Sequence, residues 1–214
     1  MKLLRRKSPL LLVLIALVAL QPAFGLRYPL SSRDIREAYF LGKGSPEKRL
    51  AFLAKYRRDF PTPAAGPHVS TIEIVTPYSY VVNHAWRTFN YLAPDAEEEF
   101  LGKPALFRIR VRIDLTASYG AQIPSKDGGF RARPDDFGKD FKVRFTQKDE
   151  IHPQTSIAQP IYQAGDDGGS WLVGNTIRLE YDPTDVDASM PARVEVITPD
   201  GQDVQTTFDL AELR

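Results

Sequence analysis

One apolar segment of the chain carries an arginine at every second position. Arg108, Arg110 and Arg112 alternate with Ile109 and Val111. In a β-strand, alternate side chains lie on one face, about 6.6 Å apart. Guanidinium groups bind carboxylates, sulfates and phosphates through pairs of N–H donors. The spacing therefore predicts a binding surface for an anionic glycan, a phosphate-bearing head group or an acidic partner.

Other expected strands also place charged residues at their polar positions. Asp114, Glu180 and Glu195 are acidic, so cross-strand ion pairs with the arginines would cancel much of a positive field. A salt-bridged and inert sheet face is the alternative interpretation of the same pattern. The further basic residues at such positions are Lys142, Arg144, Arg178 and Arg193.

Three carboxylates, Asp182, Asp185 and Asp187, fall in one expected loop. Calcium is bound by several oxygen ligands at once, and acidic loops supply them. The segment does not match the EF-hand pattern, and these aspartates could instead stabilise turns by accepting hydrogen bonds from nearby backbone. Calcium on these three residues is the one metal site that the sequence suggests. No other cofactor is expected.

The sequence gives little support to nucleophilic or zinc catalysis. It contains no cysteine and no Gly-x-Ser-x-Gly segment, and its histidines are too far apart to form a local zinc-ligand pair. Only His68, His84 and His152 could serve as an imidazole base. A hydrolase using carboxylates in the loops 120–138 or 166–170 stays open as an alternative, because long loops often carry function.

Two short helices are predicted in residues 26–60. Ser31 and Ser45 are typical N-cap residues, and Gly42 is expected to end the first helix. Residues 61–69 contain several prolines and are predicted to be a linker. The segment 26–60 is therefore expected to form a helical hairpin that the linker separates from the rest of the chain.

The remainder, residues 70–214, is dominated by alternating patterns. Phe107–Leu115 alternates apolar and charged residues without interruption, which predicts a strand with one buried and one wet face. Phe141–Thr146 and Trp171–Tyr181 are predicted strands, and Pro199-Asp200-Gly201 is a strong turn signal. Half-wet strands joined by turns favour an antiparallel, β-sandwich-like domain.

A helical insertion is predicted at about residues 77–101, after the first strand of this domain. Thr76-Pro77 is a typical helix start, and an apolar stripe at helical spacing follows. We expect this stripe to be buried, with Tyr80 and Tyr91 outside it. Its residues are Tyr78, Val81, Val82, Ala85, Trp86, Phe89 and Leu92. The expected fold class is therefore α+β: an N-terminal helical hairpin followed by an antiparallel β-sandwich-like domain with a helical insertion.

Residues 1–25 have the layout of a secretory signal peptide. A basic start is followed by the apolar run Leu10–Leu20, which is shorter than the roughly 20 residues of a spanning helix, and by Ala23-Phe24-Gly25 as a cleavage site. We expect a secreted or periplasmic bacterial protein with no membrane span after cleavage. An uncleaved signal anchor is the alternative.

The charge balance does not suggest general nucleic-acid binding. The predicted signal peptide holds four of the 28 Lys and Arg residues and none of the 27 acidic residues, so the rest of the chain is slightly acidic. We therefore expect an exported, non-enzymatic interaction module of the envelope or extracellular space, with an envelope protein or an anionic surface polymer as partner. The alternatives are a secreted carbohydrate-active or other hydrolase and a calcium-stabilised glycan-binding module.

Overall fold

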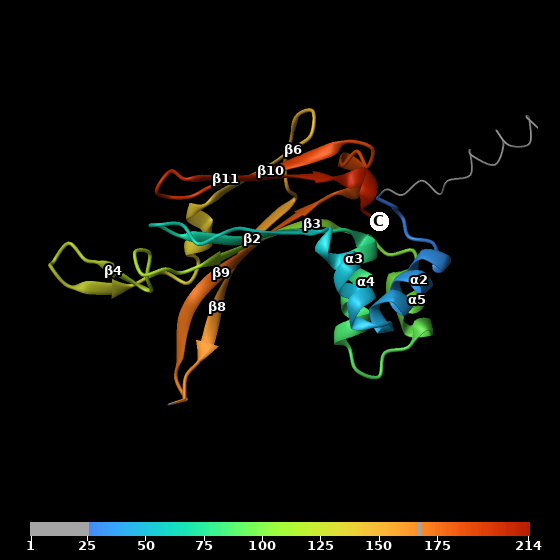
Figure 1. The fold of residues 1–214 in the computed structure, drawn as a ribbon, viewed down its shortest axis with the longest axis horizontal. Coiled ribbons are helices and arrows are strands. Elements are labelled where there is room, and N and C mark those ends of the chain that lie inside the picture. Colours follow the sequence, from blue (N-terminus) through green and yellow to red (C-terminus); the bar gives the residue numbers. More distant parts are fainter. Residues whose placement is uncertain (1–25, 167) are drawn as a thin grey trace, which may run out of the picture.

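A computed structural model describes residues 26–166 and 168–214. These residues form helices and antiparallel sheets, which confirms the α+β class (Figure 1). The predicted signal peptide, residues 1–25, lies outside the described residues. Among the described helices, none is long and apolar enough to cross a bilayer.

The larger sheet has five antiparallel strands in the order β1-β2-β3-β9-β8. β3 lies at its centre and pairs with β2 on one side and β9 on the other. β8 is an edge strand that contains Pro160 and a bulge between Ile161 and Tyr162. The strands are β1 (Arg57–Asp59), β2 (His68–Val75), β3 (Phe107–Asp114), β8 (Thr155–Ala164) and β9 (Ser170–Tyr181).

The second sheet has four antiparallel strands in the order β11-β10-β6-β7, and a separate hairpin joins β4 to β5. Gly201, at a φ of 88°, makes the tight turn between β10 and β11 where the sequence predicted one. The strands are β4 (Gln122–Pro124), β5 (Phe130–Ala132), β6 (Lys142–Thr146), β7 (Glu150–Ile151), β10 (Pro191–Ile197) and β11 (Asp203–Asp209). Three short 3-10 helices complete this part, η1 (Phe137–Asp140), η2 (Pro183–Asp185) and η3 (Leu210–Glu212).

The main hydrophobic core lies between the two sheets. Ile109, Val111 and Ile113 of β3 are fully buried in it, while the arginines between them point the other way, as the period of two predicted. Val194 and Val196 of β10 meet this face from the second sheet. The outer face of the larger sheet is therefore left for polar side chains.

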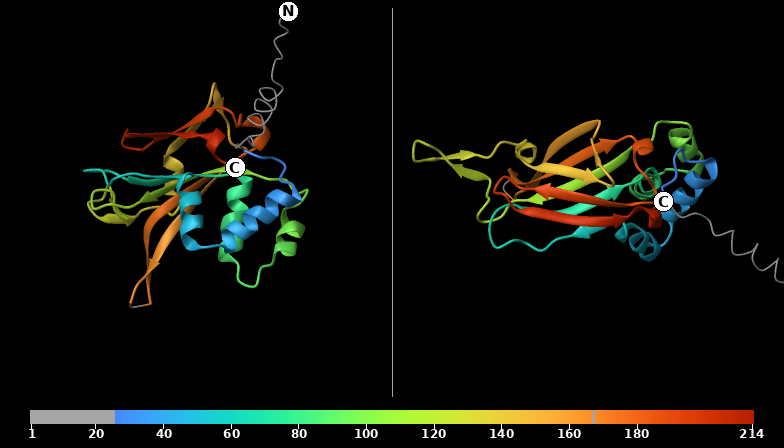
Figure 2. Two further views of the ribbon diagram at one scale, coloured as in Figure 1. Left: turned by 45° about the vertical axis from the view of Figure 1, so that its right-hand side comes forward. Right: turned by 90° about the horizontal axis from the view of Figure 1, so that it is seen from above.

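Four helices cover one end of that outer face (Figure 2). They are α2 (Ser32–Lys43), α3 (Pro46–Ala54), α4 (Pro77–Arg87) and α5 (Ala93–Phe100). α2, α4 and α5 share a second hydrophobic core, to which Ile35, Ala38, Val81 and Val82 contribute fully buried side chains. The helical segment 26–60 and the insertion therefore form one layer rather than separate parts.

Local signals set the beginnings of these helices. The Ser31 side chain accepts a hydrogen bond from the Asp34 backbone N–H, and the Ser31 backbone N–H donates to the Asp34 carboxylate in return. Thr76 makes the same reciprocal pair with Ser79, ahead of Pro77. The expected end at Gly42 is wrong, because α2 continues to Lys43. Gly42 is needed for a different reason: a Cβ there would lie 2.4 Å from the Val82 carbonyl oxygen of α4.

Arg214 ties the helical layer to the larger sheet. Its guanidinium lies 4.5 Å from the ring of Tyr78 in α4 and 2.7 Å from the Glu37 carboxylate in α2. Its backbone exchanges hydrogen bonds with the Tyr56 hydroxyl and accepts one from Thr76. Burial raises the pKa of Tyr56 to about 12, so the hydroxyl stays a donor at neutral pH.

Several boundaries differ from the sequence expectation. β1 lies inside the segment 26–60 that was predicted to be purely helical, and β2 begins at His68, inside the predicted linker 61–69. The loop 120–138 contains the β4–β5 hairpin. Short strands such as β1 are fixed by their partner strand, which local sequence does not show.

The expected burial of the whole aromatic stripe is also wrong. α4 ends at Arg87, so Phe89 and Leu92 leave the helix and are 88% and 59% exposed, while Trp86 in its last turn is 46% exposed. Tyr91, placed outside the stripe, is only 9% exposed. The helical rhythm continues in the sequence beyond the point where the helix stops.

The close approach of α2 to α4 predicts an unusual glycine effect. Alanine normally stabilises a helix over glycine by about 1 kcal/mol, but Gly42→Ala forces a backbone contact and should cost about 1–3 kcal/mol net. Gly129→Ala is the matched control, since its Cβ meets nothing within 4 Å. Thermal and urea unfolding measure both. A more stable Gly42→Ala variant would contradict the α2–α4 packing.

The Arg214–Glu37 contact predicts a pH-dependent effect. Hydrogen bonds from Arg214 and then Arg33 lower the pKa of Glu37, so the contact stabilises the fold above the ordinary value of 4.5 and is lost as pH falls through the lowered one. Arg214→Met should cost about 1–2 kcal/mol at neutral pH, with the difference from wild type shrinking below pH 4.5. Arg33→Met removes an exposed pair to the same carboxylate and should destabilise the fold much less than Arg214→Met. Equal losses in the two variants would contradict this role.

Candidate functional site

The structure brings the predicted arginines together on the outer face of the larger sheet. We call this face, with its charged residues from β2, β3 and β9, the polar sheet face. Cross-strand registry places Arg110 opposite Glu73 of β2 and opposite Arg178 of β9. Its charged residues are Glu73, Arg108, Arg110, Arg112, Asp114, Arg178 and Glu180. Lys142, Arg144 and Arg193 belong to the second sheet instead.

Each of the three predicted arginines has an acidic partner. Arg108 donates to Glu180, and Arg110 donates to Glu73, both over 2.9 Å. Arg112 donates to Asp114 on its own strand, also over 2.9 Å. The ladder therefore exists as predicted in its position, but its charges are largely paired, as the alternative interpretation required.

The pairing leaves a positive excess around Arg178. Glu180 is shared, because its carboxylate lies 2.9 Å from Arg108 and 3.4 Å from Arg178. The Arg178 Nε is buried and has no hydrogen-bond partner among the described residues. Arg178 also lies directly opposite Arg110, a like-charge pair that is unfavourable unless an anion or water lies near it.

α4 crosses this face and closes a pocket of about 160 Å³ against it. We call it the α4 pocket. The sheet contributes Val75 and Arg110, and one side of α4 contributes residues three to four apart. The helical residues are Tyr80, Asn83, His84 and Arg87. The pocket therefore combines two guanidinium groups, an imidazole and an amide.

His84 is held in place by its neighbours. Its Nε2 lies 3.3 Å from the Glu99 carboxylate, which also accepts a 2.6 Å hydrogen bond from the Tyr91 hydroxyl. Burial and the neighbouring Glu99 raise the pKa of Tyr91, so that hydroxyl remains a donor. The His84 ring also packs against Tyr80 and Tyr91. The Thr88 hydroxyl also lies 3.3 Å from Nε2, so this ring nitrogen is held by two neighbours.

Arg87 differs from the arginines of the ladder. Within residues 26–166 and 168–214 it takes part in no ion pair, and its guanidinium is 5.6 Å from the ring of Trp86. Sequence reasoning singled out Arg110 and named His84 only as a possible base, and it missed Arg87 and Asn83. The spacing of Tyr80, His84 and Arg87 on one side of a helix was the available signal.

The predicted calcium ligands do not come together. Asp182 accepts hydrogen bonds from the Thr184 backbone and hydroxyl at 2.9 and 2.7 Å, and those contacts, the backbone one first, lower its pKa. Asp187 makes the same kind of contact with Ser189. No group of three or more metal-ligating side chains occurs in the described part of the chain. Asp182 and Asp187 act as turn residues, and Asp185 lies in η2 between them.

Two carboxylates of the loop 120–138, one of those considered for a hydrolase, have partners in the structure. Asp136 lies 2.9 Å from Lys139, and Asp135 accepts a hydrogen bond from the Tyr162 hydroxyl. The other loop, 166–170, includes residue 167, which lies outside the described residues. No described residue of either loop lines the α4 pocket. The other two histidines are also placed elsewhere: His68 bonds the Phe60 carbonyl, and His152 is highly exposed.

The turn role of the aspartates predicts indifference to calcium. Because Asp182 and Asp187 each bond the turn that follows them, adding calcium or a chelator should leave the melting temperature unchanged. Asp182→Ala should instead lower the melting temperature slightly, with or without calcium, through the lost turn contact. A calcium-dependent rise in melting temperature that Asp182→Ala abolishes would restore the metal site.

Comparison with known proteins does not assign the chain to a family. The α4 pocket and the polar sheet face therefore have to be interpreted from their own contacts. No protein-family model matches the chain, and no curated protein matches it.

Proposed function

We propose that the protein is an exported, non-enzymatic binding module that holds anionic groups of an envelope or extracellular polymer on its polar sheet face. The α4 pocket is the centre of this site. One observation carries the proposal: Arg87 and Arg110, from different elements, converge with His84 on one small pocket. Leader residues 1–25 would direct the protein to the envelope or the medium.

Electrostatics favour an anion in this place. Arg110 is already paired with Glu73, but Arg87 has no carboxylate partner among the described residues. Arg178, beside Arg110, shares Glu180 with Arg108. A carboxylate, sulfate or phosphate in the α4 pocket would relieve this excess and accept charge-assisted hydrogen bonds. Paired charges on the rest of the face would then orient a polymer without binding it strongly.

The lining of the pocket supports binding rather than hydrolysis. A hydrolase of the kind considered above needs two carboxylates at the reacting bond, and the lining residues include none. His84 is the only general base among the lining residues, and the Tyr80 phenol is the only hydroxyl among them. The Thr88 hydroxyl lies 3.3 Å from the His84 Nε2 but is not part of the pocket lining. We therefore prefer the interaction module to the hydrolase.

The fold proposed from sequence fits this role. In this proposal the two sheets act as a β-sandwich-like scaffold, and the helical pair at 32–54 supports α4 on the outer face of the larger sheet. A rigid scaffold with a charged, partly covered face suits a partner that is long and repetitive. The pocket would fix one charged group of such a partner.

The proposal predicts site-specific loss of anion binding. The double variant Arg87→Gln/Arg110→Gln should bind dextran sulfate or polyglutamate at low salt about ten- to a hundred-fold more weakly than wild type, because two charge-assisted contacts are lost. Titration calorimetry at several salt concentrations measures this. Neutral dextran should not bind either protein.

A charge-matched control lies on the second sheet. Arg144 and Arg193 share Glu195 at 3.4 and 3.3 Å, so Arg144→Gln/Arg193→Gln removes the same charge elsewhere. This control should keep wild-type affinity. Equal weakening in both double variants would show nonspecific charge attraction, and unchanged binding in the first would overturn the site. Melting curves of both variants separate lost binding from lost folding.

A further inference from the structure

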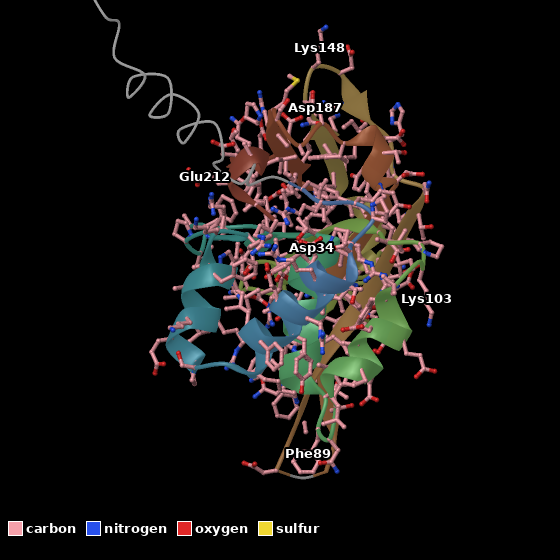
Figure 3. The ribbon with its side chains drawn as sticks, turned by 90° about the vertical axis from the view of Figure 1, so that its right-hand side faces the viewer. Asp34, Phe89, Lys103, Lys148, Asp187 and Glu212 are labelled. Atoms are coloured by element: carbon pink, nitrogen blue, oxygen red, sulfur yellow. The ribbon has the colours of Figure 1, made fainter. Side chains whose placement is uncertain are left out.

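The connection between α4 and α5 exposes large apolar side chains in a short stretch of chain. Phe89, Leu92 and Trp86 are all substantially exposed, and Phe89 almost completely so. We call these three residues the aromatic tip. Figure 3 shows Phe89 at one extreme of the molecule, at the opposite end from Lys148. Such exposure of neighbouring large apolar groups is uncommon on a surface that meets only water.

The aromatic tip is held outward by a fixed loop. On one side of Phe89, the Thr88 carbonyl accepts a 2.9 Å hydrogen bond from Lys43 of α2. On the other side, Asn90 adopts a left-handed backbone conformation with φ 53°, and Tyr91 is buried. The Tyr91 carbonyl accepts a 2.9 Å hydrogen bond from Tyr39. Phe89 is therefore presented by an anchored turn.

The backbone of this turn carries a local conformational cost. A non-glycine residue with positive φ is uncommon, and asparagine tolerates it better than most. Asn90 is the one non-glycine residue with positive φ among those described. The conformation reverses the chain between Phe89 and Tyr91, so that one ring faces solvent and the other enters the core. The unfavourable conformation of Asn90 therefore accompanies the exposed position of Phe89.

Positive charges surround the aromatic tip. Lys43 and Arg87 lie beside it through their contacts with Thr88 and with the Trp86 ring. The Arg49 guanidinium lies 4.5 Å from the centre of the Trp86 ring. It also donates a hydrogen bond to the Gly42 carbonyl near the end of α2. Two acidic residues also contact this loop: Asp95 accepts a hydrogen bond from the Leu92 backbone, and Glu99 accepts one from the Tyr91 hydroxyl. The aromatic tip is thus apolar at its centre, and the basic residues around it outnumber the acidic ones by three to two.

We propose that the aromatic tip inserts into the surface of a lipid bilayer that carries anionic head groups. Phe89 protrudes instead of lining a groove, so its partner has to envelop it, and a fluid acyl layer does this without a matching pocket. Trp and Phe are suited to the boundary between head groups and acyl chains. Lys43 and Arg87 would then reach lipid phosphates while their aliphatic stems stay near the apolar layer.

This docking is independent of anion capture in the α4 pocket, although Arg87 lies between the two sites. A bilayer contact through the aromatic tip can fail while polymer binding holds, and the reverse. The polymer experiment above does not involve Phe89, and the experiment below uses Phe89 as its main variant. The two proposals are therefore distinguished by their own measurements.

Tryptophan fluorescence tests the docking directly. The chain has two tryptophans, so Trp171→Phe leaves Trp86 as the single reporter in the full chain. With phosphatidylcholine vesicles containing phosphatidylglycerol, Trp86 emission should shift to shorter wavelength and be quenched by brominated acyl chains. Pure phosphatidylcholine should give a much weaker effect. The readout follows the aromatic tip itself, whatever the rest of the chain does at the vesicle.

A matched control places the reporter on another exposed aromatic position. Phe130 of β5 is also highly exposed, so a variant with Trp86→Phe, Trp171→Phe and Phe130→Trp reports from the β4–β5 hairpin. This reporter should not be quenched. In the Trp86 background, Phe89→Ser should weaken quenching about ten-fold, and Phe130→Ser should leave it unchanged.

Three outcomes would overturn the docking. The first is a Trp86 that is not quenched in anionic vesicles. The second is equal quenching of the reporters at positions 86 and 130. The third is a Trp86 shift that appears without vesicles and grows with protein concentration, which would make the aromatic tip a contact between copies of the chain. Equal quenching with and without phosphatidylglycerol would overturn the role of Lys43 and Arg87.

Discussion

The structure depends on the two faces of β3. Ile109, Val111 and Ile113 are fully buried between the sheets, which fixes the orientation of the whole strand. The arginines between them must then point to the outer face of the sheet, because a shift by one residue would exchange the two faces. The hydrophobic core therefore determines where the charges lie, and the helices pack onto a face that is already charged.

The charges of the polar sheet face explain why α4 leaves a pocket with polar walls above it. An ion pair such as Arg110–Glu73 tolerates partial burial only while its polar atoms keep partners or water. α4 meets this requirement by placing its own polar side chains, Asn83, His84 and Arg87, above the sheet instead of an apolar surface. Its apolar residues, among them Val81 and Val82, face α2. A pocket with polar walls follows from this division of α4 into two faces.

The sequence predicted those features that need only local information. The alternation in β3, the turn at Gly201 and the caps at Ser31 and Thr76 were all found in the structure. Of the acidic residues expected to pair with the arginines across strands, Glu180 does so with Arg108, whereas Asp114 pairs with Arg112 on its own strand. Each of these depends on neighbours in sequence or on a period of two.

The missed features depend on contacts between distant segments. β1 is three residues long and exists because β2 pairs with it. The α4 pocket requires α4 to lie across β2 and β3, which its own sequence does not specify. The exposure of Phe89 arises because Lys43 and Tyr39 hold its loop from another helix. Helical periodicity alone could not show that the helix stops before this residue.

β8 has a consequence for how the protein behaves in a crowded compartment. It is a ten-residue edge strand, exposed over much of its length, and such an edge is a template for joining sheets of separate molecules. Pro160 has no N–H to offer a neighbouring strand, and the bulge at Ile161 and Tyr162 breaks the register just beyond it. These two interruptions deny a second chain a continuous ladder, so the long edge can remain exposed without promoting fibre-like self-assembly.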